Sequence, residues 1–192
     1  MASISKEHLE ELFPSLKDIQ DTELREKIYL IWNEVLGRGN WEKLEDIKMS
    51  VPLYMINFVK HTNSTTQSAV AMAKVISEVH GYEINYDYLI AIANLHDVSK
   101  VLENDPAPES EKGLKHSELG DYFQHGLLGG YYAEKYGLPT AISAGIVCHA
   151  GNNTTLPRNL ETIIVTYADL ADADAHRLTF GGKLHLSKIK KV

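Results

Sequence analysis

The spacing of apolar residues is helical along almost the whole chain, and this feature limits the fold more than any other. Leu24, Ile28, Ile31 and Val35 recur at intervals of three and four residues, which is the spacing of one face of an α-helix. The segment "TTQSAVAMAKVISEVH" repeats the pattern, and no pair of strands joined by hairpin turn residues is visible. We therefore predict an all-α protein, folded as a compact single-domain helical bundle.

Residues that commonly begin and end helices lie at the edges of these periodic segments. Ser5, Asp21 and Asn85 are suited to begin helices, because their side chains accept hydrogen bonds from the first free backbone N–H groups. Gly37 and Gly81 are suited to end them. These five positions predict where the first helices begin and end.

Two later segments need separate interpretation. "TIIVTYA", at residues 162–168, is rich in β-branched residues, but we expect a helix there because no partner strand is visible. Residues 103–118 contain two prolines, one glycine and many charged residues. We predict that this second segment is a loop.

The charge of the chain narrows its partners. Its 192 residues carry a net charge of −7, which argues against binding a nucleic-acid polymer, because phosphate contacts need clustered lysines and arginines. The only basic stretch is at residues 183–192, and we expect it to be a solvated C-terminal tail. The acidic balance therefore favours a small-molecule substrate.

Cysteine usage and the lack of long apolar runs indicate the compartment. Cys148 is the single cysteine, so a disulfide within the chain and a cysteine-rich zinc site are both excluded. No apolar run approaches the roughly 20 residues of a membrane span, and the first residues lack the pattern of a secretion signal. We expect a cytoplasmic protein with no membrane partner.

Polar side chains interrupt three apolar helices near their ends. In "AIANLHDVSK", at residues 91–100, His96 falls on the same stripe as the apolar residues one and two turns before it. His149 ends a similar stripe, and Asp169 lies one turn after Val165. A carboxylate that points inward from an apolar helix is costly unless it is paired or bound to a metal ion.

These inward groups have two interpretations. Each histidine alone could be a hydrogen-bonded core residue. Together they form a larger set at helix ends, which a bundle would bring to one cavity: His61, His96, Asp97, His125, His149 and Asp169. A divalent cation bound by imidazoles and carboxylates would account for all of them at once.

Four segments in this order resemble the HD-domain superfamily of metal-dependent phosphohydrolases. They are "VKHTNSTTQSAVAMA", "LHDVSK", "HGLLGGYYAEKYGLP" and "ADLADADAHRL", and the resemblance spans about residues 55–180. Two positions depart from the usual pattern of the superfamily, Thr65 and Gly130, and neither is a proposed ligand. The resemblance implies a helical bundle of the HD-domain type.

The resemblance also implies a ligand set. A first metal ion would be bound by four residues: His61, His96, Asp97 and Asp169. A second ion would be bound by His125 and His149, with Asp97 bridging the two ions and acting in catalysis. A single ion, with His125 and His149 directed at the substrate, is the alternative. Manganese, iron, nickel, cobalt and zinc fit these donors better than magnesium, which prefers oxygen ligands.

The activity implied is hydrolysis of a small phosphoester, with a nucleotide as one candidate. A divalent cation lowers the pKa of bound water from ~16 towards ~7, which supplies hydroxide to attack phosphorus. Lys100 and Arg177 are candidates to stabilise the charge that develops on the phosphate. His116, Lys115 and Lys112 could close over the substrate from the expected loop, although a solvated loop is the simpler reading of all three.

Two more aspartates follow Asp169 on the last long helix. Asp172 lies about one turn further and is expected to support a metal ligand rather than bind the ion. Asp174 is expected to face solvent. Only Asp169 of the three shares the inward stripe with Val165.

Two functions from other classes are compatible with the same residues. A di-iron oxygenase could use the same histidines and aspartates, because these donors also suit iron. A regulatory module that binds a metal or ligand without catalysis is the third reading, although such a module has no need of a complete ligand set. The substrate, the metal and the number of ions are left open by the sequence.

We divide the chain into three parts. Residues 1–50 are expected to form a helical extension that packs on the core, residues 51–182 the metal-binding helical domain, and residues 183–192 the basic tail. The extension carries four aromatic residues that could form a homodimer contact: Phe13, Tyr29, Trp32 and Trp41.

Overall fold

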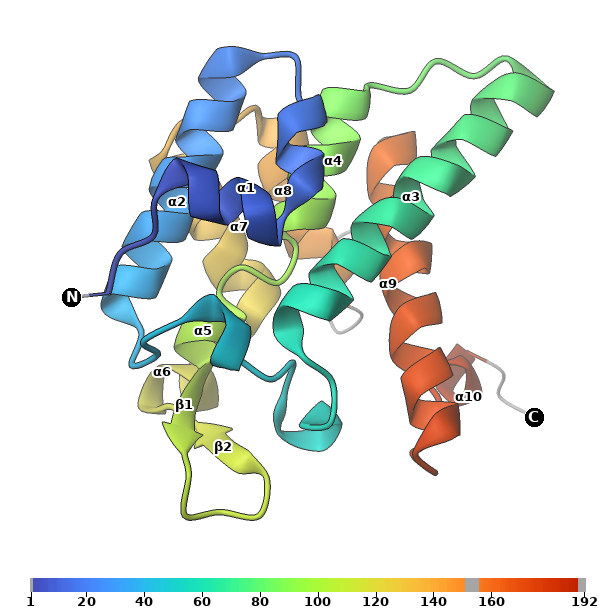
Figure 1. Cartoon of the computed structure of the whole chain (residues 1–192). Coiled ribbons are helices and arrows are strands. Elements are labelled where there is room, and N and C mark those ends of the chain that lie inside the picture. The colour runs from blue at the N-terminus through green and yellow to red at the C-terminus, as the bar shows by residue number, and fades with distance from the viewer. Residues whose placement is uncertain (1, 151–155, 190–192) are drawn as a thin grey trace.

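The computed structural model describes residues 2–150 and 156–189, and helices make up most of this part of the chain (Figure 1). The expected all-α class is therefore confirmed. The α-helices are α1 (Lys6–Leu12), α2 (Thr22–Arg38), α3 (Phe58–His80), α4 (Tyr86–Leu95), α5 (Lys100–Glu103), α6 (Glu118–Tyr122), α7 (His125–Lys135), α8 (Thr140–His149), α9 (Leu160–Thr179) and α10 (Leu186–Ile189). Short 3₁₀ helices are η1 (Pro14–Asp18), η2 (Leu44–Asp46) and η3 (Val51–Leu53), and two strands are β1 (Asn104–Ala107) and β2 (Gly113–His116).

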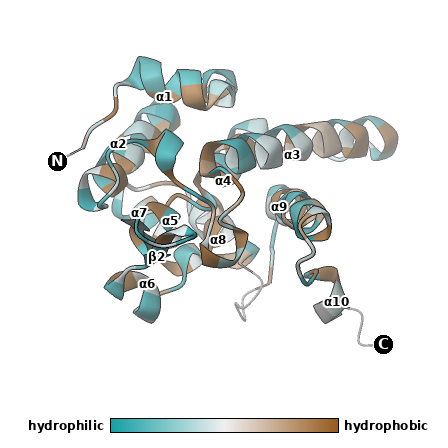
Figure 2. Cartoon of the chain, turned by 60° about the horizontal axis from the view of Figure 1, so that its bottom comes forward, coloured by the Kyte–Doolittle hydropathy of each residue, from teal (hydrophilic) through white to brown (hydrophobic). Residues whose placement is uncertain are grey.

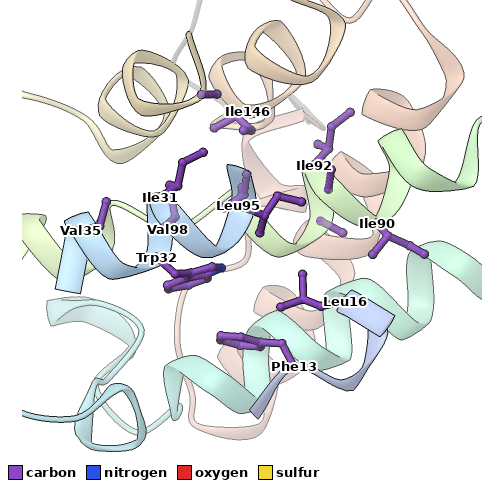
Figure 3. Close-up of a cluster of buried hydrophobic side chains, with 14 of the residues drawn as sticks. Phe13, Leu16, Ile31, Trp32, Val35, Ile90, Ile92, Leu95, Val98 and Ile146 are labelled. Atoms are coloured by element: carbon purple, nitrogen blue, oxygen red, sulfur yellow. The ribbon is translucent and has the colours of Figure 1, made fainter. Parts of the chain in front are cut away.

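Helix α4 forms the centre of the bundle. Its residues from Leu89 to Leu95 are all buried, so this part of the helix has no face towards solvent. It contacts α2, α3, α8 and α9, and Figure 3 shows Ile92 and Leu95 among side chains from α2 and α8. Because α4 is buried in this way, the residues that follow its C-terminal end lie inside the protein.

The expected helix boundaries are mostly confirmed. Ser5, Asp21 and Asn85 precede α1, α2 and α4, and each side chain accepts a hydrogen bond from a backbone N–H group of the first turn. Gly81 ends α3 with a φ of 69°, in the left-handed region that favours glycine. The segment "TIIVTYA" lies within α9, as expected.

Helix α2 does not end at Gly37, as the sequence predicted, but at Arg38, and Gly39 follows it in an extended conformation. An added Cβ at Gly39 would lie only 2.9 Å from the Cγ1 atom of Val101, so glycine allows α5 to approach the end of α2 closely. The glycine that ends the helix is thus the one at which the chain must pass α5.

Helices α7 and α8 pack very closely. An added Cβ at Gly130 would lie 2.3 Å from the Cγ2 atom of Val147, and one at Gly129 would lie 2.8 Å from the Cγ2 atom of Ile146. The glycine at position 130 departs from the usual pattern of the superfamily, and this close packing of α7 on α8 explains why a larger residue would not fit there. The close contact brings the N-terminus of α7 near the C-terminus of α8.

Part of the expected loop at residues 103–118 is a β-hairpin, so that prediction was wrong. Strands β1 and β2 are antiparallel, with Asn104 opposite His116 and Ala107 opposite Gly113. Ala107 and Leu114 are buried, so the hairpin is stabilised by packing on the domain. The two prolines and the many charged residues argued against strands in this segment, but tertiary contacts stabilise the pairing of β1 with β2.

The first 57 residues lie against the helical core rather than apart from it. The side chains of Phe13, Tyr29, Trp32 and Trp41 are all buried, and the rings of Phe13 and Trp32 are stacked 4.9 Å apart (Figure 3). These four side chains are therefore not available for a homodimer contact. A homodimer through another surface stays a prediction.

The start of the basic tail is bound to the domain. The Asp174 carboxylate accepts hydrogen bonds from the backbone N–H groups of His185 and Leu186, at 2.6 and 2.9 Å. Asp174 is thus a partly buried anchor rather than a solvent-facing residue, and residues 190–192 of the tail lie outside the described part.

Figure 2 shows hydrophilic residues along α1 and hydrophobic ones at the centre, around α4. Among the described helices, none has the length and apolar character needed to span a bilayer.

Candidate metal centre

The six predicted ligands come from five helix regions and meet at one place. His61 lies in the first turn of α3, His96 and Asp97 follow α4, and His125 is the first residue of α7. His149 is the last residue of α8, and Asp169 lies on α9. Ring centroids are 5.4 Å apart for His61 and His96, 5.0 Å for His96 and His149, and 5.3 Å for His125 and His149.

Asp97 lies between two pairs of histidines. Its Oδ2 atom is 3.5 Å from the Nε2 atoms of both His61 and His96. Its Oδ1 atom is 3.4 Å from His125 Nε2 and 3.5 Å from His149 Nε2. One carboxylate therefore faces both pairs, with a different oxygen towards each.

Two of the three aspartates of α9, Asp169 and Asp172, lie against His61. Asp169 Oδ1 is 3.2 Å from His61 Nε2 and 3.9 Å from His96 Nε2. Asp172 Oδ2 instead contacts the other ring nitrogen, His61 Nδ1, at 2.7 Å, and Asp172 Oδ1 accepts a hydrogen bond from Ser64. Asp172 thus holds the ring in place, which is the supporting role that the sequence predicted.

Hydrogen bonds at Nδ1 assign the protonation of three rings. His61 Nδ1 lies 2.7 Å from the Asp172 carboxylate, His96 Nδ1 2.7 Å from the carbonyl oxygen of Ala93, and His149 Nδ1 2.6 Å from that of Ile146. Carbonyl oxygens only accept hydrogen bonds, so Nδ1 of His96 and His149 carries the proton; the same assignment for His61 follows from its carboxylate partner. A neutral ring then directs the Nε2 lone pair at the centre.

This arrangement fits a cation. The Nε2 atoms of His61 and His96 are 3.3 Å apart, so the two rings present facing lone pairs whenever both are neutral, which is the form that binds a metal ion. Within the described residues, Asp97 Oδ2 and His149 Nε2 are buried and have no hydrogen-bond partner. Facing lone pairs and unpartnered buried acceptors are costly, and a bound metal ion would satisfy them together.

The electrostatics of the site also favour positive charge. Burial lowers the pKa of His61, but hydrogen bonds to Asp169, Asp172 and Asp97 outweigh it and raise this pKa well above 6.5. Burial dominates at His96 and lowers its pKa to about 4, so that ring is neutral and ready to act as a ligand. The same carboxylates that attract a proton at His61 would attract a metal ion.

The carboxyl groups are held in the ionised form. Burial raises the pKa of Asp97, but the charges of Lys100, His96 and His125 bring it well below 3.8. Burial also raises the pKa of Asp169, and the hydrogen bond with His61 more than offsets this and lowers it. Both side chains are therefore available as anionic ligands at neutral pH.

Lys100 is buried beside Asp97 and pairs with a glutamate that sequence reasoning missed. Its Nζ atom is 3.6 Å from Asp97 Oδ1 and 3.8 Å from Glu103 Oε2, and the residue is only 5% exposed. Glu103 Oε2 is also 3.4 Å from His125 Nδ1. The sequence signal was the three-residue spacing from Lys100, but we had assigned Glu103 to a solvated loop.

The sequence model of one family matches more than half of the chain. The HD domain model matches residues 58–174. The chain belongs to the HD domain family. This is the superfamily of metal-dependent phosphohydrolases that the motifs indicated, and the matched residues include every predicted metal ligand.

One curated relative supports the same assignment. The chain is 29% identical over 176 residues to a dihydroneopterin 2′,3′-cyclic phosphate phosphodiesterase of Methanocaldococcus jannaschii, an alignment that covers 86% of this chain and 69% of the relative. No solved structure gave a significant match. Together with the family match, the relative identifies this HD domain protein as a metal-dependent phosphohydrolase.

A cavity of about 360 Å³ opens onto this HD domain centre. Asp97, Lys100, His125, His149 and Asp169 form its polar end. The remaining wall includes apolar residues that precede the HD domain match and others within it: Met49, Pro52, Leu53, Leu170 and Ala173. Part of the wall thus comes from residues that precede the matched segment.

The structure brings only some of the predicted substrate-binding residues to the cavity. Arg177 and His116 line it, whereas Lys115 and Lys112 do not belong to its wall. Arg177 also donates a hydrogen bond to the carbonyl oxygen of Lys183, at 3.2 Å. His185, from the segment expected to be a solvated tail, lines the cavity as well.

Proposed function

We propose that this protein hydrolyses a small phosphoester with two divalent ions held on either side of Asp97. The observation that carries the proposal is the position of this carboxylate, which directs Oδ2 at His61 and His96 and Oδ1 at His125 and His149. A carboxylate with one oxygen towards each imidazole pair suits a bridging ligand.

The ligand sets follow from these distances. The first ion would be held by His61, His96, Asp97 Oδ2 and Asp169, and the second by Asp97 Oδ1, His125 and His149. Such ions, when bound, polarise a phosphoryl oxygen and lower the pKa of water. Imidazole and carboxylate donors suit manganese, iron, cobalt, nickel or zinc.

The chain's own residues would bind and orient the phosphate. The buried ammonium of Lys100 lies at the polar end of the cavity, where it would stabilise negative charge on phosphoryl oxygens. Arg177 and His116 would contact the substrate from the cavity wall. Lys115, which lies outside this wall, is proposed to reach the substrate only as it enters.

The cavity supports a small substrate. Its volume of about 360 Å³ is at the lower end of the range for small-molecule sites, about 300–1,000 Å³. The relative from Methanocaldococcus jannaschii is named for a cyclic phosphodiester of a small heterocyclic alcohol. We infer that the substrate here is a small organic phosphoester, with cyclic phosphodiesters the first class to test, and that its organic part lies against the apolar wall.

The remaining partners and the compartment are proposals of the same kind. We propose that the protein works in the cytoplasm, a reducing compartment, because it has one cysteine, and that it does not act on a nucleic-acid polymer, because its net charge is −7. We also keep residues 51–182 as the catalytic unit, with residues 1–50 as an extension and residues 183–192 as a tail.

Elemental analysis and a phosphoester panel test the proposed function. We expect up to two equivalents of a transition metal per chain, and turnover of cyclic phosphodiesters or small monoesters that stops with a chelator and returns with metal. A complete absence of turnover across the panel with each metal restored would contradict it. Oxygen-dependent turnover with a mixed-valent iron signal would favour the di-iron oxygenase instead.

A further inference from the structure

One histidine of the centre lacks the short hydrogen bond that fixes the other three. The Nδ1 atoms of His61, His96 and His149 lie 2.6–2.7 Å from an acceptor. At His125 the facing acceptor is Glu103 Oε2, at the longer distance of 3.4 Å. The tautomer of His125 therefore depends on a carboxylate from a separate element, α5.

Glu103 is positioned for this contact and has no stronger one. Its side chain is 13% exposed, and Oε2 is buried without a hydrogen-bond partner among the described residues. The same oxygen lies 3.8 Å from the ammonium of Lys100. A small shift would complete hydrogen bonds to both His125 and Lys100, because a carboxylate oxygen can accept more than one.

The backbone at Glu103 is held firmly. Its carbonyl oxygen accepts a hydrogen bond from the N–H of Ser117 at 2.9 Å, and an added Cβ at Gly120 would lie 2.2 Å from the same oxygen. The next residue, Asn104, accepts a hydrogen bond from the indole of Trp41 at 2.7 Å. A carboxylate on such a clamped segment can set the direction of a neighbouring ring.

We propose that Glu103 is a positioning residue for the second ion, which keeps His125 in the tautomer that presents Nε2. This inference rests on the proposed function. A carboxylate at the far nitrogen orients an imidazole ligand and raises its basicity. Glu103 also shares the Lys100 ammonium with Asp97, so Asp97 Oδ1 is less occupied by that cation and more available to an ion.

The test is a Mn²⁺ titration of the full-length chain after its metal has been removed with a chelator. Equilibrium dialysis with electron paramagnetic resonance resolves the affinities of the two ions. We expect Glu103→Ala to weaken the second ion by about 10- to 100-fold and to leave the first unchanged. Glu103→Gln, which keeps an acceptor oxygen, should lose less.

A matched control is Glu109→Ala, at an exposed glutamate of the hairpin turn, which should bind both ions like the unmodified protein. The proposal is overturned if Glu103→Ala keeps its second-ion affinity, if it loses both ions equally, or if the unmodified chain binds only one. Thermal melting of each variant separates a folding defect from a local one. Loss of phosphoester turnover in a chain that binds both ions would instead contradict the proposed function.

Discussion

The two sides of Asp97 are built differently. We define the inner half of the centre as His61, His96, Asp169 and Asp172, and the outer half as Lys100, Glu103, His125 and His149. The inner half rests on α3 and α9, which are 23 and 20 residues long, and on the end of the buried α4. The outer half rests on α5, which has four residues, and on the terminal residues of α7 and α8.

The histidines of the inner half are also more buried and more firmly hydrogen-bonded than His125 of the outer half. In the inner half both imidazoles have a fully buried side chain and a hydrogen bond of 2.7 Å at Nδ1. In the outer half the His125 side chain is 21% exposed and its Nδ1 contact is 3.4 Å, although His149 is buried. For the two-ion site proposed above, we expect the inner half to hold its ion more tightly than the outer half, which would exchange its ion and receive the substrate from the cavity.

The largest effect should come from the residue that joins the two halves. Asp97→Ala removes a ligand from both ion positions, so we expect the purified protein to lose bound metal and phosphoester turnover together. Elemental analysis and the phosphoester assay measure this. Asp18→Ala, at an exposed aspartate, is the control. An Asp97→Ala protein with its metal and full turnover would show that the ligand assignment is wrong.

The next effect tests chemistry in the outer half alone. Lys100→Ala removes the buried ammonium at the polar end of the cavity, so we expect both ions to stay bound while kcat falls by about 10²- to 10³-fold. Steady-state kinetics with metal analysis of the same sample measure both quantities. An unchanged kcat would remove Lys100 from the mechanism.

A smaller effect should be confined to the inner half. Asp172→Ala removes the acceptor at His61 Nδ1, and we expect the affinity for the first ion to fall by about 10- to 100-fold with the second ion little changed. The Mn²⁺ titration used for Glu103 measures this. Equal weakening of both ions would mean that the two halves are not independent.

The smallest effect is expected at Trp41, which precedes the HD domain match and contacts the segment that carries Glu103. Trp41→Phe leaves the carbonyl oxygen of Asn104 without its donor, which should lower the free energy of unfolding by about 1 kcal/mol. Chemical denaturation measures this, with Tyr82→Phe at an exposed position as the control. A Trp41→Phe protein as stable as the unmodified chain would show that this contact does not support α5.

The sequence by itself determined the helical class, most helix boundaries and the six inward polar residues. Apolar periodicity and capping residues act within a few neighbouring positions, so they can be recognised in the sequence without any knowledge of the fold. His96, His149 and Asp169 were identified because a charged or polar group on an apolar stripe needs a partner. A supporting role for Asp172 was also predictable, because it lies one turn from Asp169 on the same helix, but the sequence did not tell which ligand it supports.

Only the tertiary structure decided how those residues face one another. His61 and Asp172 are 111 positions apart, and nothing local gives the distance between their side chains. The role of Glu103 and the burial of Trp41 depend on how α5, the hairpin and α2 pack. Local spacing fixes which face of a helix a side chain takes, whereas the distance between helices is the sum of many packing contacts along the chain.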